Sequence, residues 1–349
     1  MFCAVAALAR LFFVNENKVC FMEYLQLIGG LVLLILSGNY LVESASDIAR
    51  KFKMSSLVIG LTIVAFGTSA PELLVSTNAS LSGHPEIALG NVFGSNIVNI
   101  GFIMGLTALL LPFFVSRDSI TIDVKVMLAF AIAALIFAMD GEFARWEGGL
   151  LLFFLVSYIV WLIRKSRKQK DGEEVYESPM RNIWVNLLIL VLSLTGLAYG
   201  SDFMVQGAST IAKNFGVSEK VISVTVVAIG TSLPELTASI VSVIKKEVGM
   251  TIGNVVGSNT FNIGAVLGVS SMISPISFDF SDFCSDIIWM LIFSLLLILG
   301  MINVTRNVAK MRETGKISWL WSAEEGEMGR IWGGCCLAGY ALYTFSLFV

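Results

Sequence analysis

The sequence predicts an all-α polytopic membrane protein, built from ten transmembrane helices that form two inverted five-helix repeats. Three observations lead to this fold class. The 349 residues are 56% hydrophobic and only 14% charged, whereas soluble domains carry about 25% charged residues. Apolar runs near the length that spans a bilayer recur along the whole chain. Finally, the first half of the sequence repeats in the second half, and such a repeat dictates how a protein is built.

The repeat is clearest in two pairs of matching stretches. Residues 65–72 read Ala-Phe-Gly-Thr-Ser-Ala-Pro-Glu and residues 228–235 read Ala-Ile-Gly-Thr-Ser-Leu-Pro-Glu, with six of eight positions identical. The same offset of 163 residues, with no gap, places 90–101 onto 253–264, where nine of twelve positions match. Carboxylates, hydroxyls, amides, prolines and glycines duplicated inside apolar segments indicate an ion site between two halves of a transporter.

Each half contains five apolar segments that are predicted to span the membrane. Because five is an odd number, the second half enters the membrane from the opposite side to the first, so the repeats are inverted. The predicted spans are 24–42, 55–80, 87–111, 122–140 and 146–163, then 183–204, 217–243, 250–274, 285–303 and 331–349.

Lysine and arginine are concentrated on one predicted side of the membrane. The odd-numbered connections hold 17 of the 23 basic residues, the other side holds five, and Lys125 lies at a span end. The positive-inside bias then places the 164–181 linker in the cytoplasm and both termini outside. We therefore expect a multi-pass protein of the cell (inner) membrane.

Four regions follow from this count of spans: an N-terminal extension (1–21), a first transmembrane repeat (22–163), a cytoplasmic linker (164–181) and a second transmembrane repeat (182–349). The extension has an apolar piece too short to span the membrane, and it lacks an early positive cluster and a clear cleavage site. Met22 is interpreted as the natural start. The linker is basic and then acidic, as expected of a solvated hinge.

Glu72 and Glu235 are predicted near the middle of their spans, where a charged side chain is costly and normally lines a cavity or an ion path. A proline precedes each glutamate and disrupts the helical hydrogen bond to the carbonyl four residues back, at Gly67 and Gly230. Broken backbone at this depth is tolerated where it lines a polar site, so these two carbonyls are predicted to be available ligands.

The third and eighth spans carry matching polar stripes at a spacing of four residues. Asn96 and Asn259 add amides beside these stripes. Pairs of glycines four residues apart permit close helix contact, which would bring the stripes against the glutamate-bearing spans. The stripes are Asn91, Ser95 and Asn99, mirrored by Asn254, Ser258 and Asn262, and the glycine pairs are Gly90/Gly94, Gly101/Gly105, Gly253/Gly257 and Gly264/Gly268.

Other function classes find less support in the residues. The five cysteines show no Cys-x-x-Cys spacing, which argues against a cysteine metal site or a disulfide framework. We find no nucleophile–base pair, phosphate loop or nucleic-acid patch, so we expect neither an enzyme nor a nucleic-acid partner. Any single Asn or Ser could instead serve as an interhelical hydrogen bond. Duplication of the whole set at one offset favours an ion site.

At these residues the sequence resembles the calcium/cation antiporter superfamily, most closely its prokaryotic-type sodium/calcium exchangers. The paired G-T-S-x-P-E and G-N-x-x-G-S-N-x-x-N stretches carry the resemblance, which spans both halves. Carrying the family's site over implies that Glu72 and Glu235 are shared Ca²⁺ and Na⁺ ligands. It further implies a set of flanking Na⁺ ligands and completing ligands: Thr68, Ser69, Thr231 and Ser232 with the Ala65 and Ala228 carbonyls, then Ser95, Asn99, Ser258 and Asn262.

The resemblance implies a secondary active antiporter that exchanges Na⁺ for Ca²⁺ by alternating access and has no cofactor. Potassium-dependent relatives carry aspartate where this chain has Asn262, so exchange is expected to be independent of K⁺. The resemblance also suggests that more than two Na⁺ move for each Ca²⁺, so exchange is expected to be electrogenic. Exchange coupled to H⁺ or another cation is the alternative, and a cation channel could use the same ligands. The expected partners are Ca²⁺, Na⁺ and membrane lipid, and the expected state is a monomer.

Overall fold

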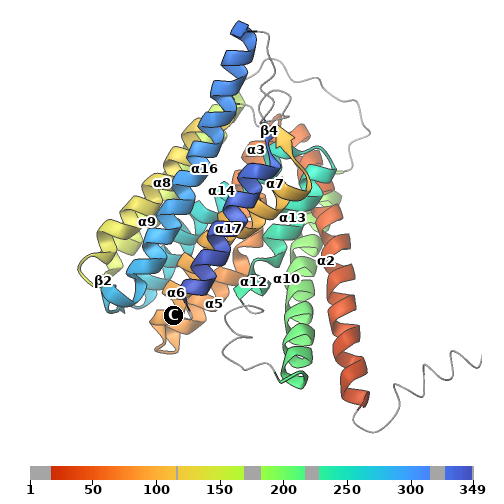
Figure 1. Ribbon diagram of the computed structural model, residues 1–349, viewed down its shortest axis with the longest axis vertical. Helices are drawn as coiled ribbons and strands as arrows, with labels where there is room; N and C mark the ends of the chain where they lie inside the picture. Colours follow the sequence, from red (N-terminus) through yellow and green to blue (C-terminus); the bar gives the residue numbers. More distant parts are fainter. Residues whose placement is uncertain (1–16, 115–116, 169–181, 217–227, 315–326, 348–349) are drawn as a thin grey trace, which may run out of the picture.

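The computed structural model describes residues 17–114, 117–168, 182–216, 228–314 and 327–347, and it is mostly helical (Figure 1). Every predicted span is mostly helical over its described part, apart from the breaks at Ser69 and Ser232 and one or two residues at some span ends. In the first half the helices are α2 (Asn17–Lys51), α3 (Ser56–Ile59), η1 (Gly60–Val64), α4 (Ala65–Thr68), α5 (Ala70–Leu81), α6 (Pro85–Ile97), η2 (Val98–Met104), α7 (Gly105–Leu110), α8 (Arg117–Ala138) and α9 (Arg145–Lys168). The η segments are short π-helical stretches.

The second half follows the same order. Residues 217–227, at the start of the predicted seventh span, lie outside the described residues. The helices of this half are α10 (Ile183–Asn214), α12 (Ala228–Thr231), α13 (Leu233–Ile244), α14 (Val248–Phe261), η4 (Asn262–Leu267), α15 (Gly268–Ile273), α16 (Phe280–Thr314) and α17 (Arg330–Ser346).

By length and composition, five helices of the described residues could cross a membrane. The number rises to six when Ser56–Thr68 and Ala70–Leu81, which meet at a bend of 44°, are taken as one broken span. Leu233–Ile244 is a shorter apolar helix. The chain is thus a multi-pass membrane protein, and the count of ten spans in two inverted repeats stays a prediction.

The predicted regions at the chain's start and middle are only partly described. Residues 17–21, predicted as part of an extension, are the first five residues of α2. Helix α9 runs to Lys168 and so includes the first five residues of the predicted linker. Helix α10 begins after an N-cap at Asn182, whose side chain accepts a hydrogen bond from the Trp184 N–H. The rest of the extension (1–16) and the linker (169–181) lie outside the described residues.

Four two-residue strands, which the sequence does not predict, join connections between helices. Strands β1 (Phe113–Phe114) and β4 (Glu327–Met328) pair antiparallel, and so do β2 (Glu142–Phe143) and β3 (Ile276–Ser277). Elements this short carry no alternating pattern that a sequence could reveal. Each ladder links two connections that the basic-residue pattern places on the same side of the membrane.

Buried apolar side chains form two clusters. The smaller contains Leu34 and Leu41 of α2 with Leu190 and Leu197 of α10. Figure 1 shows this long pair, α2 in red and α10 in green, at one side of the molecule, with α8, α9 and α16 at the other. The α2 and α10 backbones come very close, since a Cβ atom at Gly30 would lie 2.6 Å from a carbonyl oxygen of α10. The larger cluster joins α6, η2, α8, α9, α14, η4, α16 and α17.

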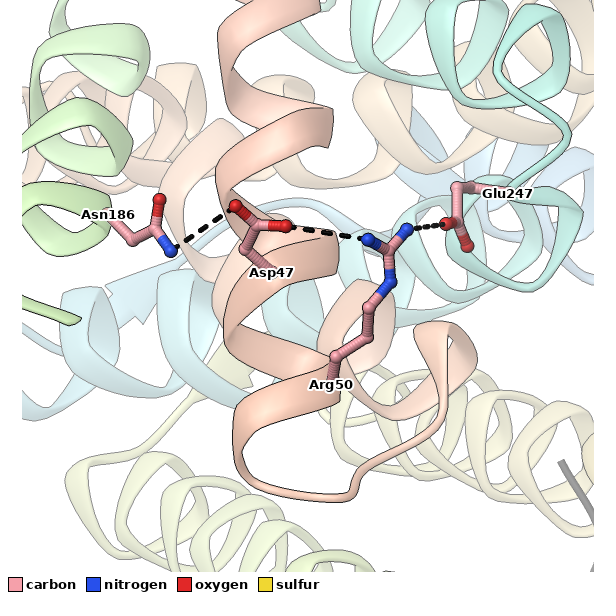
Figure 2. Close-up of polar contacts among 4 residues, drawn as sticks. All are labelled: Asp47, Arg50, Asn186 and Glu247. Atoms are coloured by element: carbon pink, nitrogen blue, oxygen red, sulfur yellow. Dashed lines mark hydrogen bonds and ion pairs between the residues drawn. The ribbon is translucent and has the colours of Figure 1, made fainter. Parts of the chain in front are cut away.

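A polar cluster ties the α2–α10 pair to the rest of the protein. Figure 2 shows Arg50 with its guanidinium nitrogens 3.5 Å from Asp47 Oδ1 and 3.6 Å from Glu247 Oε1. Asn186 of α10 donates from Nδ2 to Asp47 Oδ2 at 3.4 Å. The cluster therefore joins the end of α2, the start of α10 and the turn before α14.

Candidate cation-binding site

Each of the two matching Gly-Thr-Ser-x-Pro-Glu stretches forms a broken helix. Helix α4 ends at Thr68 and α5 begins at Ala70, with Ser69 between them at φ −85° and ψ 5°. In the second copy Ser232, at φ −93° and ψ 7°, separates α12 from α13. Proline suits the first turn of a helix because its missing N–H has no helical partner there. The break therefore puts each glutamate in the first turn of a new helix, where the helix dipole favours an anion.

Glu72 and Glu235 are buried, each with 1% of its surface exposed. Ser69 of the first half donates its hydroxyl to Glu235 Oε1 at 3.3 Å. Both carboxylate oxygens of Glu72, and Oε2 of Glu235, have no hydrogen-bond partner among the described residues. Nor does either carboxylate belong to an ion pair recorded in that part of the chain. Two buried carboxylates are costly to keep ionised together, so either a bound cation or a proton must compensate their charge.

Two asparagines hold the glutamate-bearing helices in place. Asn91 of α6 donates from Nδ2 to the Glu72 carbonyl at 3.1 Å and to Ser76 Oγ at 2.8 Å. Its repeat mate Asn254 donates to the Glu235 carbonyl and to Ser239 Oγ, both at 3.2 Å. Sequence reasoning missed the two serines, although they share the offset of 163 residues that identified the other pairs.

Hydroxyl groups connect the two halves at the same level. Thr68 donates from Oγ1 to Asn254 Oδ1 at 3.1 Å, and its hydroxyl lies 3.5 Å from that of Ser258. Ser95 donates to Asn91 Oδ1 at 3.5 Å within its own helix. The structure thus brings the predicted residues of the first broken helix against the polar stripe of α14.

Asn99 and Asn262 lie at the start of the π-helical stretches η2 and η4, an irregularity that is frequent at functional sites. Each uses its amide nitrogen to bind an amide oxygen of the other half: Asn99 Nδ2 donates to Asn259 at 2.9 Å, and Asn262 Nδ2 donates to Asn96 at 3.2 Å. Both Oδ1 atoms are buried and without a partner in the described part of the chain.

The remaining predicted residues lie beside the two breaks. Ala65 is fully buried, and its carbonyl accepts the Ser69 N–H at 3.0 Å. The Ser232 hydroxyl is buried without a hydrogen-bond partner among the described residues. Thr231 ends α12 and Ala228 begins it, but the side chain of Ala228 is outside the described part.

Two predictions about the backbone need correction. The Gly230 carbonyl, expected to be an available ligand, accepts a hydrogen bond from the Ser201 hydroxyl, because α10 packs against the second broken helix. Close packing is confirmed for Gly253, where a Cβ atom would lie 2.5 Å from the Leu57 carbonyl oxygen. The predicted close packing is wrong for Gly90 and Gly94, where a Cβ atom would meet no described atom within 4 Å.

The predicted site contains several buried oxygens without a hydrogen-bond partner among the described residues, and all of them can accept. The carboxylate and amide oxygens carry no hydrogen, and the serine hydroxyl can rotate to present a lone pair. Buried polar groups are normally hydrogen-bonded, so a group of acceptors without partners calls for a further partner, such as water or a cation. Carboxylate, amide and hydroxyl oxygens are the ligands of hard cations such as Ca²⁺. At the predicted site these oxygens are Glu72 Oε1 and Oε2, Glu235 Oε2, Asn99 Oδ1, Asn262 Oδ1 and Ser232 Oγ. Seven more buried oxygens without a partner among the described residues belong to residues outside the predicted set: Glu23 Oε2, Ser46 Oγ, Thr107 Oγ1, Asn186 Oδ1, Ser209 Oγ, Ser242 Oγ and Ser270 Oγ.

Comparison with known proteins agrees with this chemistry. A family model described as sodium/calcium exchanger protein matches residues 22–164 and 185–349. The chain is 41% identical over 252 residues to the putative antiporter CaxA of Alkalimonas amylolytica. That match covers 70% of this chain and 79% of CaxA. It is 36% identical over 306 residues to the inner membrane protein YrbG of Escherichia coli strain K12, covering 84% and 94%.

Two further proteins are named as exchangers. The sodium/calcium exchanger MaX1 of Methanosarcina acetivorans is 33% identical over 295 residues, covering 73% of this chain and 84% of that protein. A solved structure of the sodium-calcium exchanger NCX_Mj, soaked with 2.5 mM Na⁺ and 0.1 mM Ca²⁺, superposes with a TM-score of 0.74 at 33% identity. That match covers 93% of this chain and 98% of NCX_Mj. The chain is therefore similar to transporters over nearly its whole length.

Proposed function

The chain belongs to the sodium/calcium exchanger family, and we propose that it exchanges Na⁺ for Ca²⁺ across the cell membrane by alternating access. The observation that carries the proposal is the group of orphaned acceptors around Glu72 and Glu235. Both carboxylates are buried, and the oxygens near them come from both halves of the chain. A cation bound there would satisfy them, and a second kind of cation would compete for the same two charges.

The proposed ligands take three roles. Glu72 and Glu235 bind either Ca²⁺ or Na⁺ in turn, because they carry the only formal charges of the proposed set. The hydroxyls and carbonyls beside the breaks bind flanking Na⁺ ions, and the stripe residues complete the shell. The flanking set is Thr68, Ser69, Thr231 and Ser232 with the carbonyls of Ala65 and Ala228, and the completing set is Ser95, Asn99, Ser258 and Asn262.

We propose ten spans in two inverted repeats as the framework for alternating access, with both termini outside. The constant offset of 163 residues supports this architecture. So do the contacts that cross from one half to the other, such as Ser69 with Glu235 and Thr68 with Asn254. Movement of one repeat against the other around a fixed site is the expected mechanism for such a fold.

Coupling follows from the charge of the site. Two carboxylates balance one Ca²⁺ or two Na⁺, and Asn99 and Asn262 add no third acid that would favour K⁺. If more than two Na⁺ move for each Ca²⁺, as the family resemblance implies, each cycle moves net charge. One charge that crosses the bilayer changes the driving force by about 2.3 kcal/mol per 100 mV. We therefore propose electrogenic exchange that does not require K⁺.

The proposal is tested by uptake of radiolabelled Ca²⁺ into proteoliposomes loaded with Na⁺. We expect uptake that stops when choline replaces the internal Na⁺. Uptake driven by a pH gradient in choline would instead indicate H⁺-coupled exchange, and uptake without any counter-ion would indicate a channel.

Glu72→Gln and Glu235→Gln test the site itself. Each removes a charge that both ions need, so uptake should fall to the vesicle background while expression and fold are retained. Glu147→Gln is the matched control, because Glu147, in the first turn of α9, is 4% exposed and accepts only the N–H of Ala144, just before the helix, among the recorded bonds. Wild-type uptake in either site variant would show that the ions bind elsewhere.

Potassium and voltage are tested in the same vesicles. Removal of K⁺ from both sides should leave Na⁺-dependent uptake unchanged. In a parallel preparation, a potential imposed with valinomycin and a K⁺ gradient should change the rate. Uptake that needs K⁺, or that ignores the potential, would contradict this part of the proposal.

A further inference from the structure

We propose that Asn96 and Asn259 are positioning residues, which fix the side-chain amides of Asn99 and Asn262 so that their oxygens face the transported cation. The inference rests on the proposed function of the site and adds two residues that bind no ion themselves. All four side chains are buried, with at most 2% of their surface exposed. All polar side-chain atoms of Asn96 and Asn259 have partners, whereas Asn99 and Asn262 each keep an orphaned Oδ1.

The chain of orientations starts at a backbone carbonyl. Asn259 donates from Nδ2 to the carbonyl oxygen of Asn96 at 3.3 Å. A carbonyl can only accept a hydrogen bond, so the amide nitrogen of Asn259 must point at it. The oxygen of the same amide then faces Asn99, and it accepts from Asn99 Nδ2 at 2.9 Å. With its nitrogen committed there, Asn99 must present its own oxygen on the other side.

The repeat mates make the mirrored arrangement with a weaker anchor. Asn96 Oδ1 accepts from Asn262 Nδ2 at 3.2 Å, which leaves the Asn262 oxygen free. Asn96 itself donates from Nδ2 to the sulfur of Met290 at 3.4 Å. A thioether is a poor acceptor, so the orientation of Asn262 is held less firmly than that of Asn99.

Orientation matters because the two ends of an amide are opposite in their effect on a cation. The oxygen coordinates a cation, whereas the nitrogen carries two hydrogens that would repel it. The ends have nearly the same shape, so packing alone does not choose between them. Fixed hydrogen bonds to Asn96 and Asn259 do choose, and each pair joins opposite halves of the chain.

The test replaces the asparagine that is positioned, Asn99, by aspartate, whose side chain does not have to be turned one way to present an oxygen. In Asn99→Asp both side-chain ends are oxygens, so a cation meets an acceptor whichever way the group turns. Loss of an outer residue that orients a ligand costs about tenfold or more in metal affinity. We expect Asn259→Ala to raise the Ca²⁺ concentration for half-maximal effect by about tenfold in the native background. In the Asn99→Asp background the same change should have less than about a threefold effect.

Affinity is read in two ways, as Ca²⁺ protection against thermal unfolding in detergent and as Na⁺-dependent Ca²⁺ uptake in vesicles. Protection by a ligand reports binding even in a variant that does not transport. Ser271→Ala is the control, because the Ser271 hydroxyl is fully buried in the same run of helix and donates to its own Leu267 carbonyl at 2.8 Å.

The outcomes separate the two proposals. A wild-type protein without Na⁺-dependent uptake and without Ca²⁺ protection would overturn the proposed function. If the wild type shows both, an equal shift from Asn259→Ala in the two backgrounds, or no shift beyond Ser271→Ala, overturns the positioning role. If Asn259→Ala fails to fold, the same comparison is made with Asn96→Ala, first in the native protein and then in a protein that also carries Asn262→Asp.

Discussion

The Ser232 hydroxyl differs from its repeat mate although the two residues occupy equivalent breaks. Ser69 donates to Glu235, while Ser232 is buried without a hydrogen-bond partner among the described residues. A buried hydroxyl in this state lacks a partner that a flanking Na⁺ would supply. The two halves are therefore chemically matched but not in identical surroundings.

We predict that Ser232→Ala raises the Na⁺ concentration needed for half-maximal Ca²⁺ exchange several-fold, with little change in the Ca²⁺ requirement, because it removes a ligand proposed for Na⁺ alone. Titration of Na⁺ and Ca²⁺ in separate uptake series measures both quantities. Ser80→Ala is the control, since Ser80 is buried and donates to the Ser76 carbonyl at 2.9 Å. Equal shifts for both ions would contradict a separate Na⁺ role.

At the scale of the elements, α14 packs so closely on α3 and η1 that there is no room for a side chain at Gly253 of α14. A Cβ atom at Gly253 would lie 2.5 Å from the Leu57 carbonyl oxygen and 2.8 Å from the Leu61 nitrogen, both backbone atoms. At the repeat mate Gly90, no described atom lies within 4 Å of such a Cβ. Adding one methyl group should therefore affect stability in opposite ways at Gly253 and Gly90, although the two glycines occupy matching positions of the repeat.

We predict that Gly253→Ala lowers the melting temperature in detergent and the Ca²⁺ affinity, because α14 must move away from the broken helix that it contacts. Overpacking of a close contact typically costs about 1–3 kcal/mol. Gly90→Ala should leave the melting temperature unchanged or raise it slightly, since alanine favours a helix over glycine. Equal melting temperatures for the two variants would be incompatible with this packing.

Two aspartates related by the repeat each accept a hydrogen bond from a tyrosine of the next helix, although the two tyrosines do not share the repeat offset. Tyr158 of α9 donates its hydroxyl to Asp123 of α8 at 2.6 Å, and Tyr343 of α17 donates to Asp286 of α16 at 3.1 Å. The two aspartates differ by the offset of 163 residues, so the repeat could have identified them. Asp123 is 2% exposed, whereas Asp286 is only half-buried.

We predict that Tyr158→Phe destabilises the protein more than Tyr343→Phe does. The first change leaves a buried carboxylate without its hydroxyl donor, at a typical cost of about 1–3 kcal/mol or more. The second leaves a carboxylate that can reach water. Melting temperatures of the two variants measure the difference, and uptake by the folded protein should keep its Ca²⁺ requirement in both. A larger loss from Tyr343→Phe would mean that burial does not set the cost.

For the molecule as a whole, the tertiary contacts agree with the predicted grouping of connections on two sides. The two strand ladders and the ion pair between Arg50 and Glu247 each join connections predicted to share a side. Which side faces the cytoplasm stays a prediction from the 17-to-5 distribution of basic residues.

We predict that a cysteine at Ser82 in a cysteine-free background reacts with an impermeant maleimide in intact cells, because the 82–86 connection is expected outside. A cysteine at Lys51 should react only after the membrane is permeabilised. Both residues are exposed, so access differs only through the membrane. Labelling of Ser82→Cys that requires permeabilisation would reverse the predicted orientation, and with it the placement of both termini.

The sequence alone was enough to predict a helical multi-pass membrane protein and to identify the residues of the candidate site, because both depend on local information. Apolar length, the duplication at a constant offset, and a proline beside a buried acid can all be read along the chain. The same information does not fix the number of spans or where each one ends. It also does not predict the four two-residue strands, because elements this short carry no periodic pattern. Whether the identified residues bind ions stays a prediction.

Only the tertiary structure decided which groups meet, because the contacts join segments that are far apart in the chain. It paired Ser69 with Glu235, placed Ser201 on the Gly230 carbonyl that the sequence left free, and packed Gly253 tightly while leaving Gly90 open. The amide of Asn99 could turn either way until Asn259 of the other half met its nitrogen. A repeat makes two halves similar in sequence, but the side chains packed around each copy determine which of its polar atoms remain free.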